Sequence, residues 1–334
     1  MPRTKPISLA RIGDWHNVAW ALNRAARGKR RGIPVARALA RPERTIDQVS
    51  EALRAGQLPI GRFRAFAIRD PKRRLIHAAD FLDRVAHHAL VRFLEPVLEK
   101  ALLPSVYACR VGKGVHAAVL DAQRQARRFR WVMHLDIAGY FPAIDHRVLR
   151  GQLRRRFRGD GLRLVDAVIA AHQGDLGRGL PIGALTSQHF ANHYLNDADR
   201  WCLAWPGIGA HLRYMDDLLL FAADKASLLE LRAGLADYLA ERLRLRLKPA
   251  LIQRTANGFL FCGVRIRPYA LRPSLRRRRR YRAALRYWEQ CWQAGAIGAL
   301  ELQRAHDAAH AILLPADDPA WRRHCLARRE MVDA

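Results

Sequence analysis

The clearest candidates for chemistry are three aspartates. Asp216 and Asp217 are adjacent in RYMDDLLLF, and Asp136 ends the apolar run WVMHLD. An isolated carboxylate is costly to bury, and neighbouring like charges repel each other. Two Mg²⁺ ions about 3.5–4 Å apart would neutralise such a group and hold the attacking and leaving oxygens of a phosphoryl transfer. The three aspartates therefore indicate a two-metal site.

The residues around the pair distinguish this site from an exposed polar turn. Aspartate is common in turns, so an isolated Asp-Asp pair favours a surface turn. Here apolar, strand-like runs flank the pair, and the strand that ends at Asp136 supplies a partner. Side chains alternate along a strand, so Asp216 and Asp217 cannot both face the same way. We expect one to be the main metal ligand and the other to assist.

The elements that must position these aspartates alternate between helix and strand. Residues 62–77 alternate apolar and polar side chains on both sides of Asp70-Pro71, which is typical of a hairpin. Asp145 is placed to cap a helix that begins at HRVLRGQL. We also expect basic helices within 14–57 and further helices at 79–100, 114–128, 187–204 and 225–243. Strands are expected at 131–136, on each side of the aspartate pair, and at 259–266.

The composition predicts a polyanionic partner. Lys and Arg number 59 against 30 Asp and Glu, a formal net charge of +29, and 50% of the residues are hydrophobic. Such a field favours nucleic acid, although a basic protein with a preference for Arg would show part of the same excess. From about residue 271 the sequence reads as a separate, basic helical domain.

The cysteines and the apolar runs bear on location. The five cysteines are scattered without a CxxC pair, which fits free thiols in a reducing compartment. The N-terminal stretch has no apolar core of a secretory signal, and no apolar run approaches the roughly 20 residues that span a bilayer. We expect a cytoplasmic protein with no membrane partner.

Five ordered stretches resemble the reverse transcriptases. YMDD (214–217) is similar to their catalytic turn, and LDIAGYFPAIDH (135–146) to their first catalytic strand. GLPIGALTSQHFANHYL (179–195) resembles the loop and helix that hold the template and the incoming nucleotide, and FLFCGVRI (259–266) the primer-gripping hairpin. DPKRRLIHAADFLDRVAHHAL (70–90), followed by SVYACRVGKG (105–114), resembles the fingers of bacterial enzymes. YMDD alone is a weak match, whereas the five in order are a strong one.

The resemblance implies an α/β (α+β) right-hand polymerase. Residues 1–130 would form fingers with an N-terminal helical extension, 131–268 the antiparallel-sheet palm with an insertion at 147–190, and 269–334 a basic helical thumb. Such an enzyme extends the 3′-OH of a DNA or RNA primer with dNTPs on an RNA template. It uses two Mg²⁺ ions per active site, for which Mn²⁺ can substitute.

The resemblance also implies roles for single residues at the metal site and the sugar. Asp136 and Asp216 would be the principal metal ligands, Asp217 would assist, and the carbonyl of Ile137 could complete one site. Phe141 lies where the family places its steric gate against a ribose 2′-OH; packing in the core is the alternative.

Further residues would bind the nucleotide or the nucleic acid. Lys72 and Arg74 could meet the triphosphate, with a solvated basic turn as the alternative reading. Lys248 lies a few positions before the lysine that the family expects. The other nucleotide-binding candidates are Ile182, Gly183 and Gln188. The nucleic-acid-binding candidates are Tyr214, Met215, Gly263, Arg276, Arg277, Arg278, Arg279 and Arg280; the arginine run could instead be a solvated helix face.

Ile182 and Gln188 indicate a subgroup. Many relatives have QGxxxSP where this chain has IGALTSQ, a variant that resembles the enzymes of diversity-generating retroelements. That subgroup copies with errors at template adenines and works with a small basic accessory variability protein, although Ala184 departs from its usual Asn. The alternatives are a stand-alone enzyme of a retron or phage-defence system and a catalytically silent RNA-binding protein. The three intact aspartates argue against the silent protein.

Overall fold

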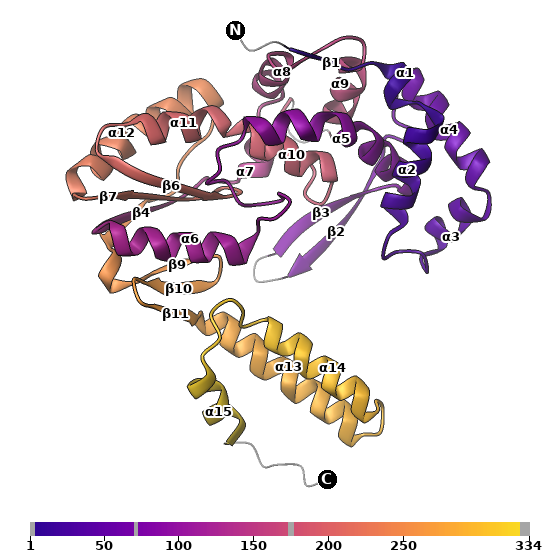
Figure 1. Cartoon of the computed structure of the whole chain (residues 1–334). Coiled ribbons are helices and arrows are strands. Elements are labelled where there is room, and N and C mark those ends of the chain that lie inside the picture. The colour runs from indigo at the N-terminus through magenta and orange to yellow at the C-terminus, as the bar shows by residue number, and fades with distance from the viewer. Residues whose placement is uncertain (1–3, 70–72, 173–176, 328–334) are drawn as a thin grey trace. The chain divides into compact units, whose positions relative to one another are not determined.

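The computed structural model describes residues 4–69, 73–172 and 177–327. Helices and strands group into two compact units, each built from separated segments of the chain (Figure 1). Unit 1 contains Met1–Pro104, Ile137–Cys202 and Ala233–Lys248, and unit 2 contains Ser105–Asp136, Leu203–Arg232 and Pro249–Ala334. The predicted division into fingers, palm and thumb names functional parts and stays a prediction.

Unit 1 is mainly helical. Its central helix α5 packs against α2, α4 and α10, and β2 pairs with β3 as the antiparallel hairpin that the sequence predicted. The Asp70-Pro71 turn lies outside the described residues. The elements of this unit are β1 (Lys5–Pro6), α1 (Leu9–Ile12), α2 (Trp15–Ala26), α3 (Ile33–Ala40), α4 (Pro42–Arg54), β2 (Phe63–Arg69), β3 (Arg73–Ala79), α5 (Phe81–Ala101), α7 (Tyr140–Ala143), α8 (His146–Arg154), β5 (Phe157–Arg158), α9 (Leu162–Ala170) and α10 (Leu185–Tyr194).

Unit 2 contains a four-stranded antiparallel sheet in the order β6-β7-β4-β8. Its strands are β4 (Trp131–Asp136), β6 (Ile208–Tyr214), β7 (Asp217–Ala222) and β8 (Leu251–Arg254). Helix α6 (Val115–Arg128) packs against β6 and β7 and also against β10 (Val264–Arg267). In Figure 1, α6 accordingly lies between this sheet and the three-stranded sheet that contains β9 (Phe259–Phe261), β10 and β11 (Ala270–Pro273).

One face of the four-stranded sheet changes from apolar to polar along the strands. Directly opposed residues in an antiparallel pair project to the same face. Ala210, Phe221 and Val132 form one such row across β6, β7 and β4, and all three belong to the hydrophobic core shared with α6. The next row contains two leucines and His134, and the last contains Tyr214 and two aspartates. The apolar row and the two leucines therefore anchor a polar row at the end of the sheet.

Two predicted elements have different boundaries in the structure. The single helix predicted over 187–204 is two helices, α10 and α11 (Asn196–Ala204), and Leu195 ends the first. The single strand predicted over 259–266 is wrong: the segment is the hairpin of β9 and β10, as the resemblance of FLFCGVRI implied. Cys262 and Gly263 both have positive φ, 47° and 75°, and two such residues form the tight turn that matches the twist of paired strands.

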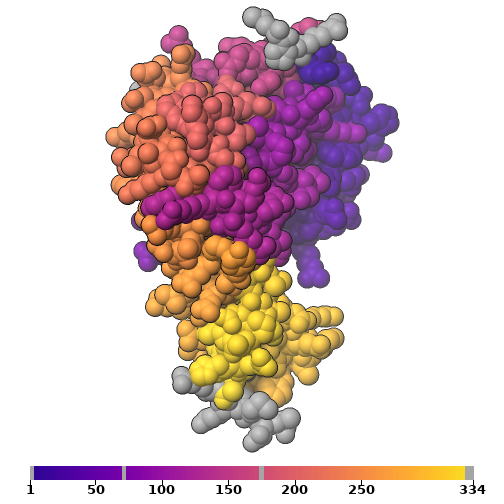
Figure 2. Space-filling model, turned by 60° about the vertical axis from the view of Figure 1, so that its left-hand side comes forward, coloured from indigo at the N-terminus to yellow at the C-terminus, as the bar shows by residue number. Residues whose placement is uncertain are grey.

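The C-terminal segment is helical, as predicted, from Leu275 onward. Helix α13 (Leu275–Gln293) packs along α14 (Ala299–Ala311), and α15 (Pro319–Ala327) follows. Tyr281 and Leu285 of α13 form a small core with Ala309 and Leu313, against which Trp321 packs. The surface of these helices appears in orange to yellow in Figure 2.

The remaining long helix, α12 (Lys225–Leu243), follows β7 and its residues are divided between the two units. Across the described parts of the chain, no helix combines the length and the apolar character needed to cross a membrane.

Candidate active site

The register of the sheet brings two of the three predicted aspartates together. Asp136 is directly opposite Asp217 across β4 and β7, and Tyr214 is opposite Asp217 across β6 and β7. All three side chains are half-buried and project to one face. Asp216 occupies the two-residue turn before β7, after Met215, which has a φ of 57°. The ranking of Asp216 above Asp217 as a metal ligand stays a prediction.

His134 is a neighbour of this pair that the sequence reasoning missed. It lies two residues before Asp136 on β4, so it faces the same side of the sheet. Its Nε2 atom contacts Oδ1 of Asp217 on the adjacent strand, as expected for diagonal neighbours in an antiparallel pair. The alternation of side chains along WVMHLD already predicts that His134 and Asp136 face the same side of the sheet.

Arg213 supports the aspartate turn from the other face of the sheet. It is the largest fully buried side chain of the chain's described core, with 0% exposure. Its Nη1 donates a hydrogen bond to the carbonyl oxygen of Met215 at 3.0 Å. Its backbone is held by Ser105 and Tyr107, at 2.9 Å each. A buried guanidinium needs acceptors, and this one uses an acceptor in the turn.

The carboxylates suit a magnesium ion by their chemistry. Oxygen ligands from Asp are those that Mg²⁺ prefers, and Asp136 and Asp217 lie opposite each other on one face. Among the residues that the structure describes, no group of three or more His, Cys, Asp or Glu side chains is already arranged to hold a metal ion. The two opposed carboxylates fit a cation between them, and the participation of Asp216 stays a prediction.

The predicted nucleotide-binding residues lie in unit 1, where backbone hydrogen bonds connect several of them. The amide of Leu180 donates to the carbonyl of Phe141 at 2.9 Å, and the amide of His77 on β3 donates to the carbonyl of Ile182 at 3.0 Å. Gly183 has a φ of +113°, and a Cβ there would lie 3.2 Å from Ile76. The backbone conformation therefore favours glycine, and a side chain there would also crowd Ile76 of β3.

The remaining candidates of unit 1 differ in their surroundings. Phe141 is half-buried and packs edge-on against Tyr140, with ring centroids 5.7 Å apart. Ile182 and Gln188 are half-buried, and Arg74 and Lys248 are exposed. Ile137 is buried and pairs with Leu247. Lys72 lies outside the described residues.

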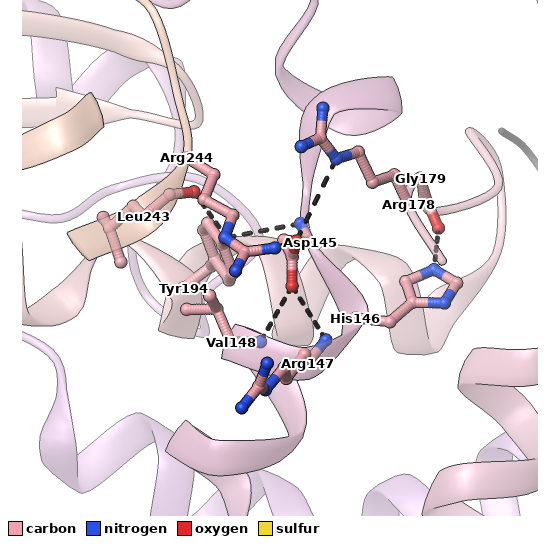
Figure 3. A network of polar contacts seen from close by, with 9 residues as sticks. All are labelled: Asp145, His146, Arg147, Val148, Arg178, Gly179, Tyr194, Leu243 and Arg244. Atoms are coloured by element: carbon pink, nitrogen blue, oxygen red, sulfur yellow. Dashed lines mark hydrogen bonds and ion pairs between the residues drawn. The ribbon is translucent and has the colours of Figure 1, made fainter. Parts of the chain in front are cut away.

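Asp145 is the centre of a polar network that holds the loop after residue 177 (Figure 3). Its Oδ1 accepts hydrogen bonds from the amides of Arg147 and Val148 at 2.9 and 3.0 Å, so its predicted role as the cap of α8 is confirmed. Its Oδ2 accepts from Arg244 at 2.8 Å. Its backbone pairs with that of Arg178 in an antiparallel bridge. Asp145 thus connects a helix start, a loop and the residue that follows α12.

Tyr194 and His146 complete this network. The hydroxyl of Tyr194 accepts from the amide of Asp145 at 3.3 Å and donates to the carbonyl of Leu243 at 2.7 Å. Burial raises the pKa of Tyr194, so the hydroxyl keeps its proton as a donor. The imidazole of His146 contacts the carbonyl of Gly179 at 2.6 Å, and its amide donates to the carbonyl of Gly177. The loop that leads to Ile182 is therefore fixed by two consecutive residues.

The five consecutive arginines near the start of α13 do not share one environment. Arg277 donates to the carbonyl oxygens of Cys262, Ile312 and Leu314. Arg278 pairs with Asp318 at 3.0 Å. These two guanidiniums are occupied by contacts within the protein, and a Cβ at Gly263 would lie 2.8 Å from Nε of Arg277. The exposed arginines of the run are Arg276, Arg279 and Arg280.

Comparison with known proteins identifies the family of this chain. A family model described as "Reverse transcriptase (RNA-dependent DNA polymerase)" matches residues 69–266, more than half of the chain. Protein YkfC of Escherichia coli (strain K12) is 26% identical over 245 residues, which cover 60% of this chain and 62% of YkfC.

The solved structure of apo telomerase from Candida tropicalis is similar with a TM-score of 0.51 and 11% sequence identity, over 76% of this chain and 57% of that one. This likeness confirms the predicted mixed α/β polymerase fold. The chain spans less than two thirds of either relative.

Replacing Arg213 by Met should lower the free energy of unfolding by about 1–3 kcal/mol, because the half-buried carbonyl of Met215 loses its donor. Urea unfolding monitored by circular dichroism measures the loss. Arg232→Met, at an exposed position of α12, is the matched control and should have little effect. Equal losses in the two variants would contradict a supporting role for Arg213.

Replacing Asp145 by Asn should show a pH-dependent loss of stability. Burial by itself would raise the pKa of Asp145, but hydrogen bonds from the Val148 amide and the Arg244 guanidinium hold it below its ordinary value of 3.8. A lowered carboxylate pKa stabilises the folded state above pH 3.8, and this contribution disappears as the pH falls through the folded-state pKa.

We therefore expect Asp145→Asn to lower the free energy of unfolding by about 1–3 kcal/mol at pH 7, and the difference from the native chain to shrink below about pH 4. Urea titrations at a series of pH values provide the measurement. Asp237→Asn, exposed on α12, is the control. A difference that persists unchanged in acid would show that the charge of Asp145 is not the cause.

Proposed function

The chain belongs to the reverse transcriptase (RNA-dependent DNA polymerase) family, and from this premise we propose that it is an RNA-directed DNA polymerase. It would extend a primer 3′-OH with dNTPs on an RNA template. The observation that supports the proposal most directly is the register of the sheet, which sets Asp136 opposite Asp217 beside the turn that contains Asp216. Carboxylates held together on a rigid sheet are what metal-assisted phosphoryl transfer requires.

In this proposal the residues of unit 2 hold and orient the metal ligands. Asp136 and Asp217, with Asp216, would bind Mg²⁺ or Mn²⁺, and the bound ions would stabilise the charge that develops on the transferred phosphate. His134 contacts one oxygen of Asp217 and leaves the other oxygen of that carboxylate for a cation. Arg213 holds the Met215 carbonyl and so fixes the backbone from which Asp216 projects.

The residues of unit 1 would bind the nucleotide. Phe141 is half-buried rather than fully packed, so its ring can meet the sugar and exclude a 2′-OH. The exposed guanidinium of Arg74 can reach phosphate oxygens. Gly183 lets the backbone of the loop approach closely. The exposed Arg276, Arg279 and Arg280 would contact the phosphates of the primer and template, a contact that depends on salt and not on sequence.

Within the family we propose the diversity-generating type. Its support is the pair Ile182 and Gln188 in IGALTSQ. Ile182 has no side-chain donor for the sugar of the nucleotide, so a mispaired nucleotide is rejected less strictly. This type would copy template adenines with errors and act with a small basic accessory protein on a structured template RNA.

The aspartates provide the direct test of polymerase activity. Loss of an outer-shell partner of a metal ligand lowers metal affinity or activity by about 10–100-fold. Loss of a ligand itself should cost more. We therefore expect Asp136→Asn, Asp216→Asn and Asp217→Asn each to lower primer extension by more than about 100-fold. The assay measures dNTP incorporation on a primed RNA template with Mg²⁺ and with Mn²⁺. Asp237→Asn serves as the control and should retain activity. Unchanged incorporation in Asp136→Asn and Asp217→Asn would refute the metal-site assignment.

Ile182 provides the test of the subtype. Ile182→Gln adds a donor that can check the position of the sugar, so misincorporation opposite template adenine should fall several-fold relative to the native chain. Sequencing of the products from a template with equal numbers of the four bases gives the error at each base. The control is Ile33→Gln, because Ile33 is exposed. Ile169 is buried, so Ile169→Gln would not be a suitable control. A native chain with equal errors at all four bases would contradict the diversity-generating type and leave the polymerase proposal intact.

A further inference from the structure

A hollow in unit 1 lies apart from every residue assigned above to the metal or the nucleotide. It has a volume of about 720 Å³ and is bordered by α8, α11 and the end of α12. In Figure 2 the side of the molecule that carries α11 faces the viewer. Ligand sites commonly have volumes of about 300–1,000 Å³, so the hollow is large enough for a small organic group.

Two stacked aromatic rings form part of its wall. Trp201 of α11 and Tyr238 of α12 stack with ring centroids 5.1 Å apart and an interplanar angle of 30°. Both side chains are half-buried, so part of the aromatic surface borders the hollow. A planar group that stacks on such a surface gains about 1–3 kcal/mol when it is a nucleic-acid base.

Guanidinium groups surround the aromatic pair. Four arginines line the hollow against two acidic residues, Asp197 and Glu241. Arg155 pairs with Asp197 at 2.7 Å, and Arg244 pairs with Asp145. Arg147 and Arg242 are exposed and form no ion pair with any residue that the structure describes. These two fork-shaped groups are available for phosphate oxygens.

A glycine in the middle of α8 opens the floor of the hollow. Gly151 lies one turn after Arg147 and one turn before Arg155, and glycine inside a helix costs about 1 kcal/mol relative to alanine. A Cβ built at Gly151 would have nothing within 4 Å. Close packing therefore does not explain this glycine, whereas the space beside it belongs to the hollow.

We propose that this hollow binds one nucleotide of a single-stranded nucleic acid, with the base against Trp201 and Tyr238 and the phosphate at Arg147 and Arg242. A duplex keeps its bases stacked inside and would offer only phosphates to the arginines. An acidic peptide would likewise leave the aromatic surface unused. Only an unpaired nucleotide matches both the rings and the guanidiniums, which is the combination that single-strand-binding grooves use.

The experiment measures binding and needs no polymerase activity. The probe is a fluorescein-labelled 12-nucleotide oligouridylate that contains 4-thiouridine, and its affinity is measured by fluorescence anisotropy. A saturating blunt-ended RNA–DNA duplex, which has no unpaired bases, is added to cover other basic surfaces. Because the readout is binding, it stays informative if primer extension fails.

Two pairs of full-length variants separate the hollow from general charge and folding. Gly151→Trp fills the hollow, whereas Gly151→Ala adds only a methyl group to open space. Arg147→Ala with Arg242→Ala removes two charges at the hollow. Arg37→Ala with Arg44→Ala removes two exposed charges elsewhere in unit 1. Thermal unfolding checks that all four variants are folded.

We expect Gly151→Trp and the Arg147/Arg242 variant to weaken binding by about tenfold, and the two control variants to bind like the native chain. Ultraviolet crosslinks, mapped by mass spectrometry, should lie in the peptides that contain Trp201 or Tyr238. The proposal would be overturned if each variant of the hollow bound the oligonucleotide as tightly as its control. Crosslinks confined to other peptides would also overturn it. AMP that competes as well as the oligonucleotide does would show a free-nucleotide site and overturn it too.

Discussion

Two carboxylates, Asp136 and Asp217, face each other across neighbouring strands, and their repulsion is the constraint on which unit 2 depends. Like charges directly opposite each other destabilise a sheet. Val132 and Phe221 on the same face are fully buried, and their burial stabilises the register that the aspartates oppose. The charged row is thereby held in place by its apolar neighbours, and a bound cation would remove the repulsion that remains.

Backbone positions near the candidate sites are held by side-chain donors. Met215, Cys262 and Arg244 have positive φ values of 57°, 47° and 54°, a conformation that costs non-glycine residues about 1–3 kcal/mol. A hydrogen bond supports each one: from Arg213 to Met215, from Arg277 to Cys262, and from Tyr194 to the carbonyl next to Arg244. The same chemistry thus stabilises the turn at Met215 and Asp216, the β9–β10 hairpin and the chain beside Asp145.

Much of the fold could be predicted because periodicity is local. The hairpin of β2 and β3, the strand that ends at Asp136 and the cap at Asp145 follow from alternation and from capping chemistry. The predicted boundaries of two elements were wrong where one or two residues change the direction of the chain. Leu195 divides a predicted helix, and Cys262 with Gly263 reverses a predicted strand. The arginine run shows the same limit, since Arg277 binds carbonyl oxygens within the protein and Arg279 is exposed.

The sequence by itself determined the family and the residue types of the site, because the ordered motifs and their aspartates are properties of the chain. It also determined the basic charge and the unusual pair Ile182 and Gln188. Only the tertiary structure decided that Asp217 lies opposite Asp136, since register depends on the burial of a whole sheet face and not on a motif. Tertiary packing likewise decided which arginines bind the protein, because partners distant in sequence meet only after folding.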